Sequence, residues 1–513
     1  MSIPVVRPDD RGIPTLYVND APFFCRSGEI HNSSASSLEF LEKEVWPHLR
    51  GLNLNSVIAP LYWELIEPVE GSYDFTLLDG MIRQARAEGL RLILLWFGLW
   101  KNGESMYVPA WMKRDTSTYY RVRKANGEAI NTISPLCKAA VAKDKAAFAA
   151  IMRHLREIDG EENTVITIQV ENEIGVLGAE RDYSAEAEVA FADEVPADVA
   201  GLFGVVGCWR EAFGAEAEEY FMASAYARAV EEITAAGRAE YPLPCYANAW
   251  LEQYPWYKGS YPCGGPVRRV HKIWKALAPS LFALGPDIYV PYCADVMDEY
   301  AYEGNPLFIP EIRKDAVAAS YCLYAFFAKN AICFSPFGVE ELTMDESQID
   351  KPPMEVMIAL NIDPSAFDIT GSGEKLAAAY RLVENLEPIY LAHRGTPRLK
   401  AAVRHGENDF GTFMQFSEFD LSVSWSPRRS GNPLGSLAVF ELTPEKFLLV
   451  GTESGISFRV KPGENQRVGY IRIEEGEVER GVWKPGRVLN GDEMMAIKFG
   501  SMPKAFVVEL YKY

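Results

Sequence analysis

Short apolar runs alternate with longer segments of helical periodicity from the N-terminus to about residue 340. In one such segment Met222, Tyr226, Val230 and Ile233 form an apolar stripe, and Gly237 offers a stop. Strands that alternate with helices in this way predict βα units and a parallel sheet. We predict eight strands, which cover Phe23–Ile30, Leu54–Pro60, Leu90–Phe97, Val165–Val170, Leu243–Asn248, Leu284–Val290, Pro306–Pro310 and Ala331–Ser335. Eight strands are what a closed (β/α)8 barrel, the TIM barrel of the α/β class, requires.

The pattern changes after a last predicted helix near Gly373–Leu391. Downstream, apolar residues recur at every second position, as Phe506, Val508 and Leu510 do, and Pro-Gly pairs separate the runs. Such patterning is typical of antiparallel strands, so we predict a small β-sandwich-like domain over 393–513 after a catalytic barrel over 1–392. The Ala/Glu-rich stretch 176–214 follows the fourth strand, and we expect it to fold over the mouth of the barrel.

Charge and cysteine content narrow the classes of function. The formal charge of −20 argues against nucleic-acid and anionic-membrane partners and suits a neutral substrate, although it could serve solubility alone. The eight cysteines form no CxxC pair and several lie in apolar runs, so we expect reduced core thiols. No signal peptide is visible at the N-terminus, which favours the cytoplasm, or the periplasm if a leader was removed.

Two predicted strands end in glutamate. The fourth strand runs into Glu171-Asn172-Glu173, and the seventh runs into Glu311. Catalytic side chains in a barrel lie just past the C-terminal ends of the strands, where they converge on one cavity. Two carboxyl groups so placed suit glycoside hydrolysis, in which one is the acid/base and the other the nucleophile. We predict Glu173 as the acid/base and Glu311 as the nucleophile, although a single glutamate at a strand end is more often a solvated group.

Glu171 is the rival to Glu173, because residues two apart on an alternating strand face the same side. The neighbouring amide helps to decide between them. Asn172 directly precedes Glu173, and an amide beside the acid can donate a hydrogen bond to the sugar 2-hydroxyl.

The motif Val170-Glu171-Asn172-Glu173-Ile174-Gly175 resembles the acid/base signature of glycoside hydrolase family 35, the β-galactosidases. The run Arg26–His31 resembles that family's first-strand motif, and Tyr62–Pro68 is similar to its second-strand motif and also to family 42. The usual Ala-Glu-Trp segment is replaced by Trp96–Gly103, as in a divergent bacterial subgroup with a β-rich C-terminal domain. The resemblance implies a clan A barrel, net retention, no metal or other cofactor, and Glu173 rather than Glu171 as the acid.

Further candidates for substrate binding lie near the predicted strand ends. Aromatic rings pack against the apolar faces of sugars, although they are also ordinary residues of a core edge. Tyr289 could also hydrogen-bond Glu311, and Glu29 could accept bonds from sugar hydroxyls or form a salt bridge with Arg26 or Arg313. A lone histidine such as His31 is more often a satisfied structural group. The candidates are Glu29, Tyr62, Trp100, Asn172, Trp250, Tyr289 and Tyr292.

We therefore expect a retaining exo-β-galactosidase that acts on oligosaccharides. The alternatives are another retaining β-glycosidase, such as a glucosidase or xylosidase, and a non-catalytic glycan-binding protein on a decayed barrel. The C-terminal domain could bind glycans, cover the barrel or support a homo-oligomer, and we favour the structural role.

Overall fold

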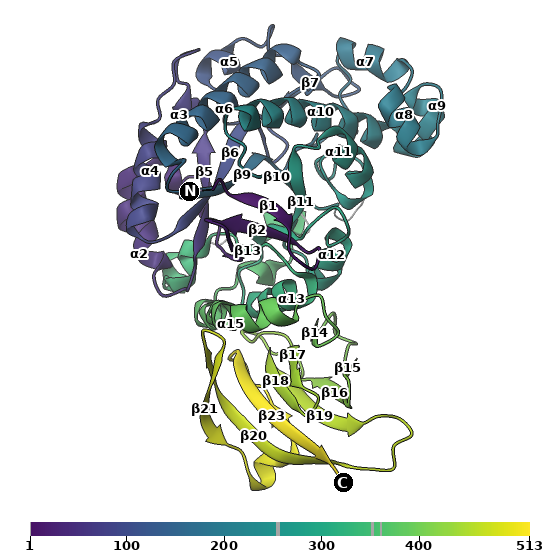
Figure 1. The fold of residues 1–513 in the computed structure, drawn as a ribbon. Coiled ribbons are helices and arrows are strands. Elements are labelled where there is room, and N and C mark those ends of the chain that lie inside the picture. The colour runs from purple at the N-terminus through teal and green to yellow at the C-terminus, as the bar shows by residue number, and fades with distance from the viewer. Residues whose placement is uncertain (1, 253–256, 350–352, 360–361) are drawn as a thin grey trace.

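The computed structural model describes residues 2–252, 257–349, 353–359 and 362–513. Its centre is a barrel of parallel strands (Figure 1). In spatial order the strands are β4 (Cys25–Arg26), β13 (Cys333–Pro336), β12 (Phe308–Ile312), β11 (Leu281–Ile288), β10 (Cys245–Trp250), β9 (Val165–Asn172), β6 (Arg91–Lys101) and β5 (Ser56–Tyr62). A parallel bridge between Glu29 and Ile58 closes the ring. All eight predicted strands are confirmed, and with them the (β/α)8 barrel.

Helices surround the barrel (Figure 1), and their buried apolar residues belong to its core. The strands they cover are buried on both faces, as every residue of β5 and β9 is, and this explains their nearly continuous apolar runs. The helices between the strands are α1 (Leu38–Phe40), α2 (Trp46–Leu49), α3 (Trp63–Ile66), α4 (Thr76–Ala87), α5 (Ala110–Arg114), α6 (Lys138–Asp159), α10 (Ala217–Glu240), α11 (His271–Leu277), α12 (Cys293–Tyr300) and α13 (Ala318–Lys329). After the last strand come α14 (Met354–Ala359) and α15 (Ser372–His393).

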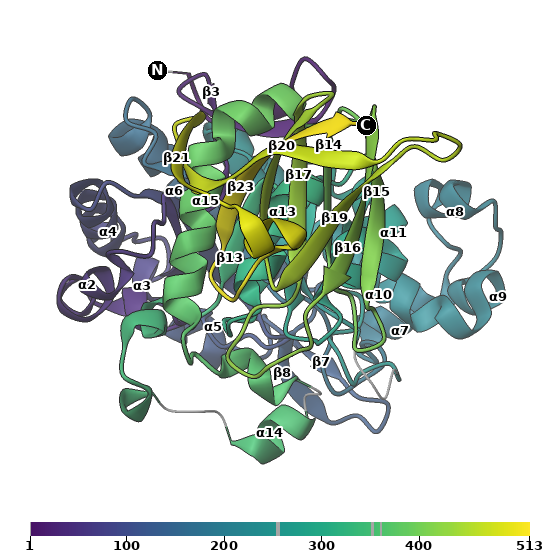
Figure 2. The same ribbon diagram turned by 90° about the horizontal axis from the view of Figure 1, so that it is seen from below.

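The stretch 176–214 does not fold over the mouth, and this prediction is wrong. It forms α7 (Ala185–Ala192), α8 (Ala197–Phe203) and α9 (Trp209–Phe213), which lie at the side of the barrel (Figure 2). Their aromatic rings pack on the first turns of α10, as Trp209 does on Phe221 at 5.5 Å between ring centroids. Because α7, α8 and α9 use their apolar side chains to pack against α10, those side chains cannot cover the site.

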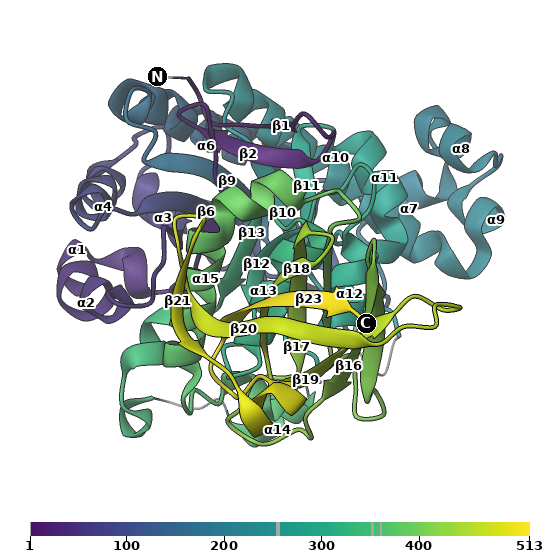
Figure 3. The same ribbon diagram turned by 60° about the horizontal axis from the view of Figure 1, so that its bottom comes forward.

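The C-terminal strands form two antiparallel sheets (Figure 3). The larger sheet contains, in order, β14 (Leu399–Val403), β17 (Ser436–Thr443), β18 (Lys446–Thr452), β23 (Lys504–Lys512), β20 (Val468–Glu479) and β21 (Val482–Val488). The smaller contains β15 (Gly411–Gln415), β16 (Phe419–Trp425), β19 (Ser454–Val460) and β22 (Ile497–Lys498). The expected antiparallel β-rich domain is thereby confirmed. Short antiparallel pairs elsewhere are β1 (Val5–Pro8), β2 (Pro14–Val18) and β3 (Ala21–Pro22), and β7 (Arg121–Arg123) with β8 (Ala129–Ile133).

The central strands of the larger sheet, β17, β18 and β23, are buried on both faces over most of their length. In β17, Leu437 and Val439 point into the core between the two sheets, whereas Ala438 and Phe440 belong to the core of the barrel. Phe440 meets Phe327 of α13 edge to face, with 5.5 Å between ring centroids. The barrel helices, the larger sheet and the smaller sheet thus form three packed layers, with one apolar core on each side of the larger sheet.

The cysteines agree with the expectation from the sequence. All eight cysteines are free thiols, and every one except Cys208 is buried, in line with reduced core residues. Among the described helices, none combines the length and the apolar character that crossing a membrane requires.

Candidate active site

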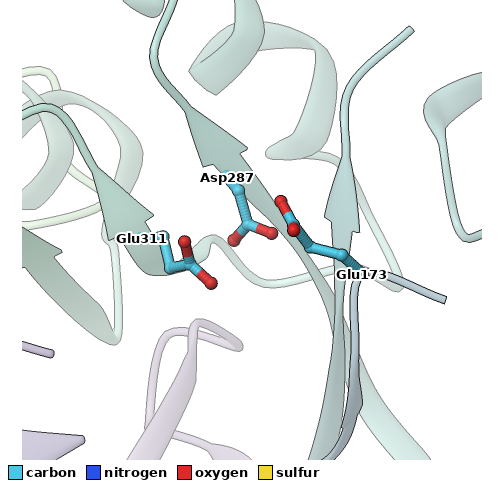
Figure 4. Close-up of side chains that lie close together, drawn as sticks. All are labelled: Glu173, Asp287 and Glu311. Carbon is cyan, nitrogen blue, oxygen red and sulfur yellow. The ribbon is translucent and has the colours of Figure 1, made fainter. Parts of the chain in front are cut away.

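Glu173 and Glu311 meet at the C-terminal mouth of the barrel (Figure 4). Glu311 lies within β12 and Glu173 directly follows β9, and both side chains are buried. A third carboxyl group, that of Asp287 on β11, lies with them. One oxygen atom of each group lies within 4.8 Å of the others. The structure therefore brings the two predicted catalytic residues together, and it adds an aspartate that the sequence did not single out.

The end of β9 has an unusual backbone that aims two adjacent side chains at this site. Glu171 and Glu173 both have positive φ, at 63° and 45°. Non-glycine residues in this left-handed region are uncommon and concentrate at functional sites. The twist breaks the strand's alternation, so Asn172 and Glu173 both reach the cavity, although neighbours in a regular strand face opposite sides.

Glu171 points away from the site, contrary to the same-side expectation from alternation. Its carboxyl group hydrogen-bonds Asp144 of α6 and accepts the backbone N–H of Trp100 at 2.7 Å. Burial, followed by the charge of Asp144, raises the pKa of Glu171 well above its ordinary value. Glu171 is therefore a structural acid behind the strand, and it is not placed to act as the acid/base.

Three donors hold the Glu311 carboxylate. The Asn172 and Asn248 amides donate to Oε1 at 3.1 and 3.3 Å, and the Tyr289 hydroxyl donates to Oε2 at 2.7 Å. Donors aimed at both oxygens hold the carboxylate in one orientation, as a nucleophile requires. The predicted contact between Tyr289 and Glu311 is present.

Lys101, at the end of β6, fixes which way the Asn172 amide faces. Its ammonium group donates to Asn172 Oδ1 at 2.9 Å and to Asn102 Oδ1 at 2.5 Å. Because Oδ1 is engaged, Nδ2 of Asn172 is left to face Glu311. Lys101 is buried, so its positive charge acts at short range on the carboxyl groups of the site.

Glu173 has the environment of a general acid. Burial, followed by the negative charge of Glu311, raises its pKa to about 8, against the opposing effect of Lys101. Its backbone N–H donates to Asn248 Oδ1 at 2.9 Å. A carboxyl group that holds its proton at neutral pH beside a stabilised carboxylate is the division of roles that glycoside hydrolysis needs.

Glu29 is 1% exposed, and neither of its carboxyl oxygens has a hydrogen-bond partner among the described residues. The salt-bridge alternatives are wrong, because Arg26 pairs with Glu384 and Arg313 pairs with Asp315 and Asp363. Burial, and then Glu311, raises the pKa of Glu29 well above its ordinary value. Two unsatisfied buried oxygens are costly unless a ligand supplies donors, which suits a substrate-binding role.

Two of the predicted aromatic residues, Tyr62 and Trp250, are the last residues of barrel strands. Tyr62 is buried beside Phe97 and Tyr107, with ring centroids 5.9 and 5.7 Å away. Trp250 ends β10 at the mouth and is half-buried.

Two other aromatic predictions do not hold. Trp100 is fully buried, donates its indole N–H to the Ile133 carbonyl and packs on Tyr226 of α10, so it faces away from the site. A register shift between Trp96 and Lys101 of β6 changes which side chains face inward. Tyr292 is half-buried and lines a pocket of about 350 Å³ with Arg313 and Arg404, a pocket to which neither glutamate contributes.

His31 pairs with Glu341 at 2.8 Å, in agreement with a satisfied structural group. The residues that sequence reasoning missed are Lys101, Asn248 and Asp287. Each is a polar residue at or near the end of a strand of the structure. Only Asn248 also ends a predicted strand, which is the signal that revealed Glu173 and Glu311, whereas Lys101 lies past one predicted strand and Asp287 lies within another.

Among the described residues, only Glu173, Asp287 and Glu311 bring three carboxyl groups close enough to hold a metal ion. The amide and hydroxyl donors on Glu311 and the amide on Asp287 already occupy oxygen lone pairs that a cation would need. The expectation that the protein uses no metal stays a prediction.

Comparison with known proteins gives two family matches along the chain. Residues 43–221 match a family model described as "Beta-galactosidase", that of glycoside hydrolase family 42, and residues 376–499 match one described as a domain of unknown function, DUF5597. The first match includes Glu173 and ends before Glu311. Residues 43–221, which include β5, β6 and β9 of the barrel, are thus similar to glycoside hydrolases. Family 35, which the motifs resembled, is not supported, because the matching model is that of family 42.

A β-galactosidase of Xanthomonas manihotis is 28% identical over 180 residues, which are 34% of this chain and 27% of that protein. The match thus spans about a quarter of the relative. Among solved structures, the catalytic domain of a β-amylase from Paenibacillus polymyxa has a TM-score of 0.48 at 12% identity, covering 62% of this chain and 92% of that one. A β-galactosidase from Bacillus circulans sp. alkalophilus has a TM-score of 0.45 at 13% identity, covering 61% and 50%. The strand order given above, rather than these likenesses, establishes the barrel.

Proposed function

We propose that the protein is a retaining exo-β-galactosidase that releases terminal β-galactosyl units from oligosaccharides. The observation that carries this proposal is the pairing of Glu173 and Glu311, with oxygen atoms within 4.8 Å, a raised pKa for Glu173 and three hydrogen-bond donors on Glu311. Retaining glycosidases place these groups roughly 5–5.5 Å apart, whereas inverting enzymes leave about 6.5–9.5 Å for a water molecule. The spacing favours double displacement.

In the first step Glu311 attacks the anomeric carbon while Glu173 gives its proton to the departing oxygen. The bond to the leaving group breaks, and an ester between the sugar and Glu311 remains. In the second step Glu173, now ionised, takes a proton from water, and the water oxygen displaces Glu311. Asn172 and Tyr289 hold the Glu311 carboxylate in position for both steps.

Sugar recognition falls to Glu29 in this proposal. Its two unpartnered oxygens can accept hydrogen bonds from two hydroxyl groups of a terminal sugar. Tyr62 and Trp250 are the last residues of β5 and β10, at the same end of the barrel. Galactose is favoured by the two similarities to β-galactosidases. A glucosidase or xylosidase would use the same carboxyl groups.

A panel of p-nitrophenyl β-glycosides, tested on the wild type, on Glu311→Gln and on Glu64→Gln, examines the proposal. Glu64 is a partly exposed partner of Lys113 and serves as the matched control. We expect release from the galactoside by the wild type and the control and at least a 10³-fold loss in Glu311→Gln. Proton NMR of the first product formed should show the β-anomer.

Each other outcome has a definite meaning. Release from a different sugar alone keeps the mechanism and rejects galactose. An α-anomer as first product rejects retention. No release from any glycoside or longer oligosaccharide, together with measurable sugar binding, would favour the non-catalytic glycan-binding protein.

A further inference from the structure

Asp287 occupies the centre of the site, between the two glutamates (Figure 4). It is 2% exposed. Its Oδ2 accepts a hydrogen bond from Asn248 Nδ2 at 2.7 Å, and the same amide reaches Glu311 Oε1 at 3.3 Å. Its Oδ1 is buried and receives no bond from any described amide, hydroxyl or amine. The two-step mechanism above assigns this carboxyl group no task.

One carboxyl oxygen of Asp287 lies within 4.8 Å of a carboxyl oxygen of Glu173, and a hydrogen bond from Asp287 acts to lower the pKa of Glu173. Two carboxyl groups can form such a bond only when at least one of them carries a proton, because two carboxylates have no hydrogen to share. Glu173 needs its own proton for the leaving group. After that proton has left, the bond can persist only if Asp287 supplies the hydrogen.

The charges around Asp287 favour its protonated form. It faces Glu173 beyond β9, Glu311 on β12, Glu29 beyond β4 and the single ammonium group of Lys101 on β6. One cation can balance one carboxylate, and the three donors on Glu311 stabilise that residue as the ionised one. Burial, and after it the nearby carboxylates, raises the pKa of Asp287 well above its ordinary value.

Tyrosines complete the surroundings. Tyr289 directly follows β11, and Tyr246 of β10 and Tyr300 of α12 also face Asp287. Burial raises the pKa of each of these phenols well above its ordinary value, so they remain neutral and add no charge.

We propose that Asp287 is a permanently protonated positioning residue whose O–H donates to Glu173 and stabilises that carboxylate once Glu173 has protonated the leaving group. During the first step the single negative charge of the site moves from Glu311, which becomes an ester, to Glu173. The proton of Asp287 stays on Asp287 through both steps, so atoms and charges balance without a further reactant. This inference rests on the proposed glycosidase mechanism and deepens it.

Infrared difference spectra between the wild type and Asp287→Asn test the proton directly and require no activity. At neutral pH the wild type should show the carbonyl stretch of a protonated carboxyl group that the variant lacks, and the band should shift when aspartate carries a carboxyl ¹³C label. If the spectra contain no such band, the proposal is overturned, whatever the protein hydrolyses.

The pH dependence of kcat/KM tests the hydrogen bond, with opposite signs for the two protonation states. Asp287→Leu removes a donor that favours ionised Glu173, so the pKa of Glu173 should rise and the basic limb should move to higher pH. Asp287→Asn keeps a neutral donor, so the limb should stay in place while kcat falls by up to about tenfold. An ionised Asp287 predicts the reverse for Asp287→Asn, because removal of a negative charge would move the limb to lower pH, and that result contradicts the proposal.

The leaving group separates this role from a merely structural one. Asp287→Leu should slow release of phenol from a phenyl glycoside by about 10²-fold, but release of dinitrophenol far less, because dinitrophenol needs no acid. Equal losses on both substrates reject the role, and Asp287→Asn decides the question if the leucine variant does not fold. A wild type that hydrolyses no glycoside would reject the proposed function and leave the infrared result to decide the protonation state.

Discussion

Adjacent residues of a β-strand normally face opposite sides, yet Asn172 and Glu173 share one cavity. The positive φ angles of Glu171 and Glu173 make this possible, and Gly175 continues the distortion with a φ of 144°. A Cβ atom at Gly175 would collide with the carbonyl group of Pro262, so only glycine fits there. This unfavourable backbone conformation allows Glu173 and the amide of Asn172 to face the same cavity.

Burial of Glu173 has a price in stability that can be measured. Its pKa is about 8 in the folded protein against 4.5 for an ordinary glutamate, so the folded state keeps a proton that the unfolded state loses. Stability from this group is fully present below pH 4.5 and is lost as pH rises toward 8. We expect Glu173→Gln to be more stable than the wild type at pH 8, by on the order of 1–3 kcal/mol, and equal to it near pH 4.

Thermal unfolding of both proteins across this pH range provides the measurement. Glu64→Gln, on the surface, should follow the wild type at every pH. A difference between wild type and Glu173→Gln that does not change with pH would refute the link to this proton.

Lys101 gives the second prediction at this scale. Lys101→Met removes the donor that holds Asn172 and the positive charge that lowers the pKa of Glu173. We expect kcat/KM on an active glycoside to fall by roughly 10²-fold and the basic limb of its pH profile to move to higher pH. Lys113→Met, which affects a partly exposed lysine paired with Glu64, is the control. A basic limb that moves to lower pH would contradict the charge argument.

At the scale of elements, the end of β6 is held from behind by α6. Asp144 accepts the Trp96 indole N–H at 2.8 Å and the Leu99 backbone N–H at 2.9 Å, and it hydrogen-bonds Glu171 of β9. A Cβ atom at Gly98 would collide with these same polar groups. Asp144 thus joins β6 and β9, the two strands that carry Lys101 and Asn172.

Removal of Asp144 should loosen both strands. Asp144→Leu leaves the Trp96 and Leu99 N–H donors without an acceptor in a buried place and removes one partner of the Glu171 carboxyl group, which costs about 3–5 kcal/mol. Asp144→Asn keeps an acceptor and should cost less than half as much. Denaturant unfolding measures both variants, and equal stability of the two would show that the hydrogen bonds of Asp144 contribute little.

The elements show what the sequence could and could not predict. Apolar runs revealed all eight barrel strands, because burial on both faces leaves an unmistakable pattern, although ends such as that of β6 were misjudged. Trp100 was assigned to the site because the hydrophobic pattern of the sequence gives no sign of the register shift in β6. Asp287 was overlooked because a single aspartate in an apolar strand gives no periodic signal. The placement of 176–214 depended on its partner α10, which no local pattern reveals.

At the scale of the whole molecule, the barrel and the larger C-terminal sheet share one core. Phe440 of β17 is fully buried against α13 and α15, where it meets Phe327 and His393. Phe440→Ala should therefore destabilise the barrel as well as the C-terminal domain, by about 3–5 kcal/mol. Phe413→Ala, at a position 71% exposed in β15, should change stability by less than about 0.5 kcal/mol.

Thermal unfolding, measured in parallel by calorimetry and by loss of glycosidase activity, tests this coupling. A single transition that shifts as a whole in Phe440→Ala is the expected result. Two separate transitions, with activity following only the one that Phe440→Ala leaves in place, would show that the two parts fold independently.

Because the central strands of the larger sheet are buried on both faces, the barrel and the C-terminal domain cannot simply be exchanged with those of other proteins. A barrel transplanted without the C-terminal strands would present the apolar surface of α13 to water, and the sheet transplanted alone would present Ala438, Phe440, Leu448 and Val450. Either fragment would gain a patch of the kind that drives aggregation. Barrel and sheet therefore depend on each other structurally. A chimaera can replace one of them only with a part whose contact surface fits the other.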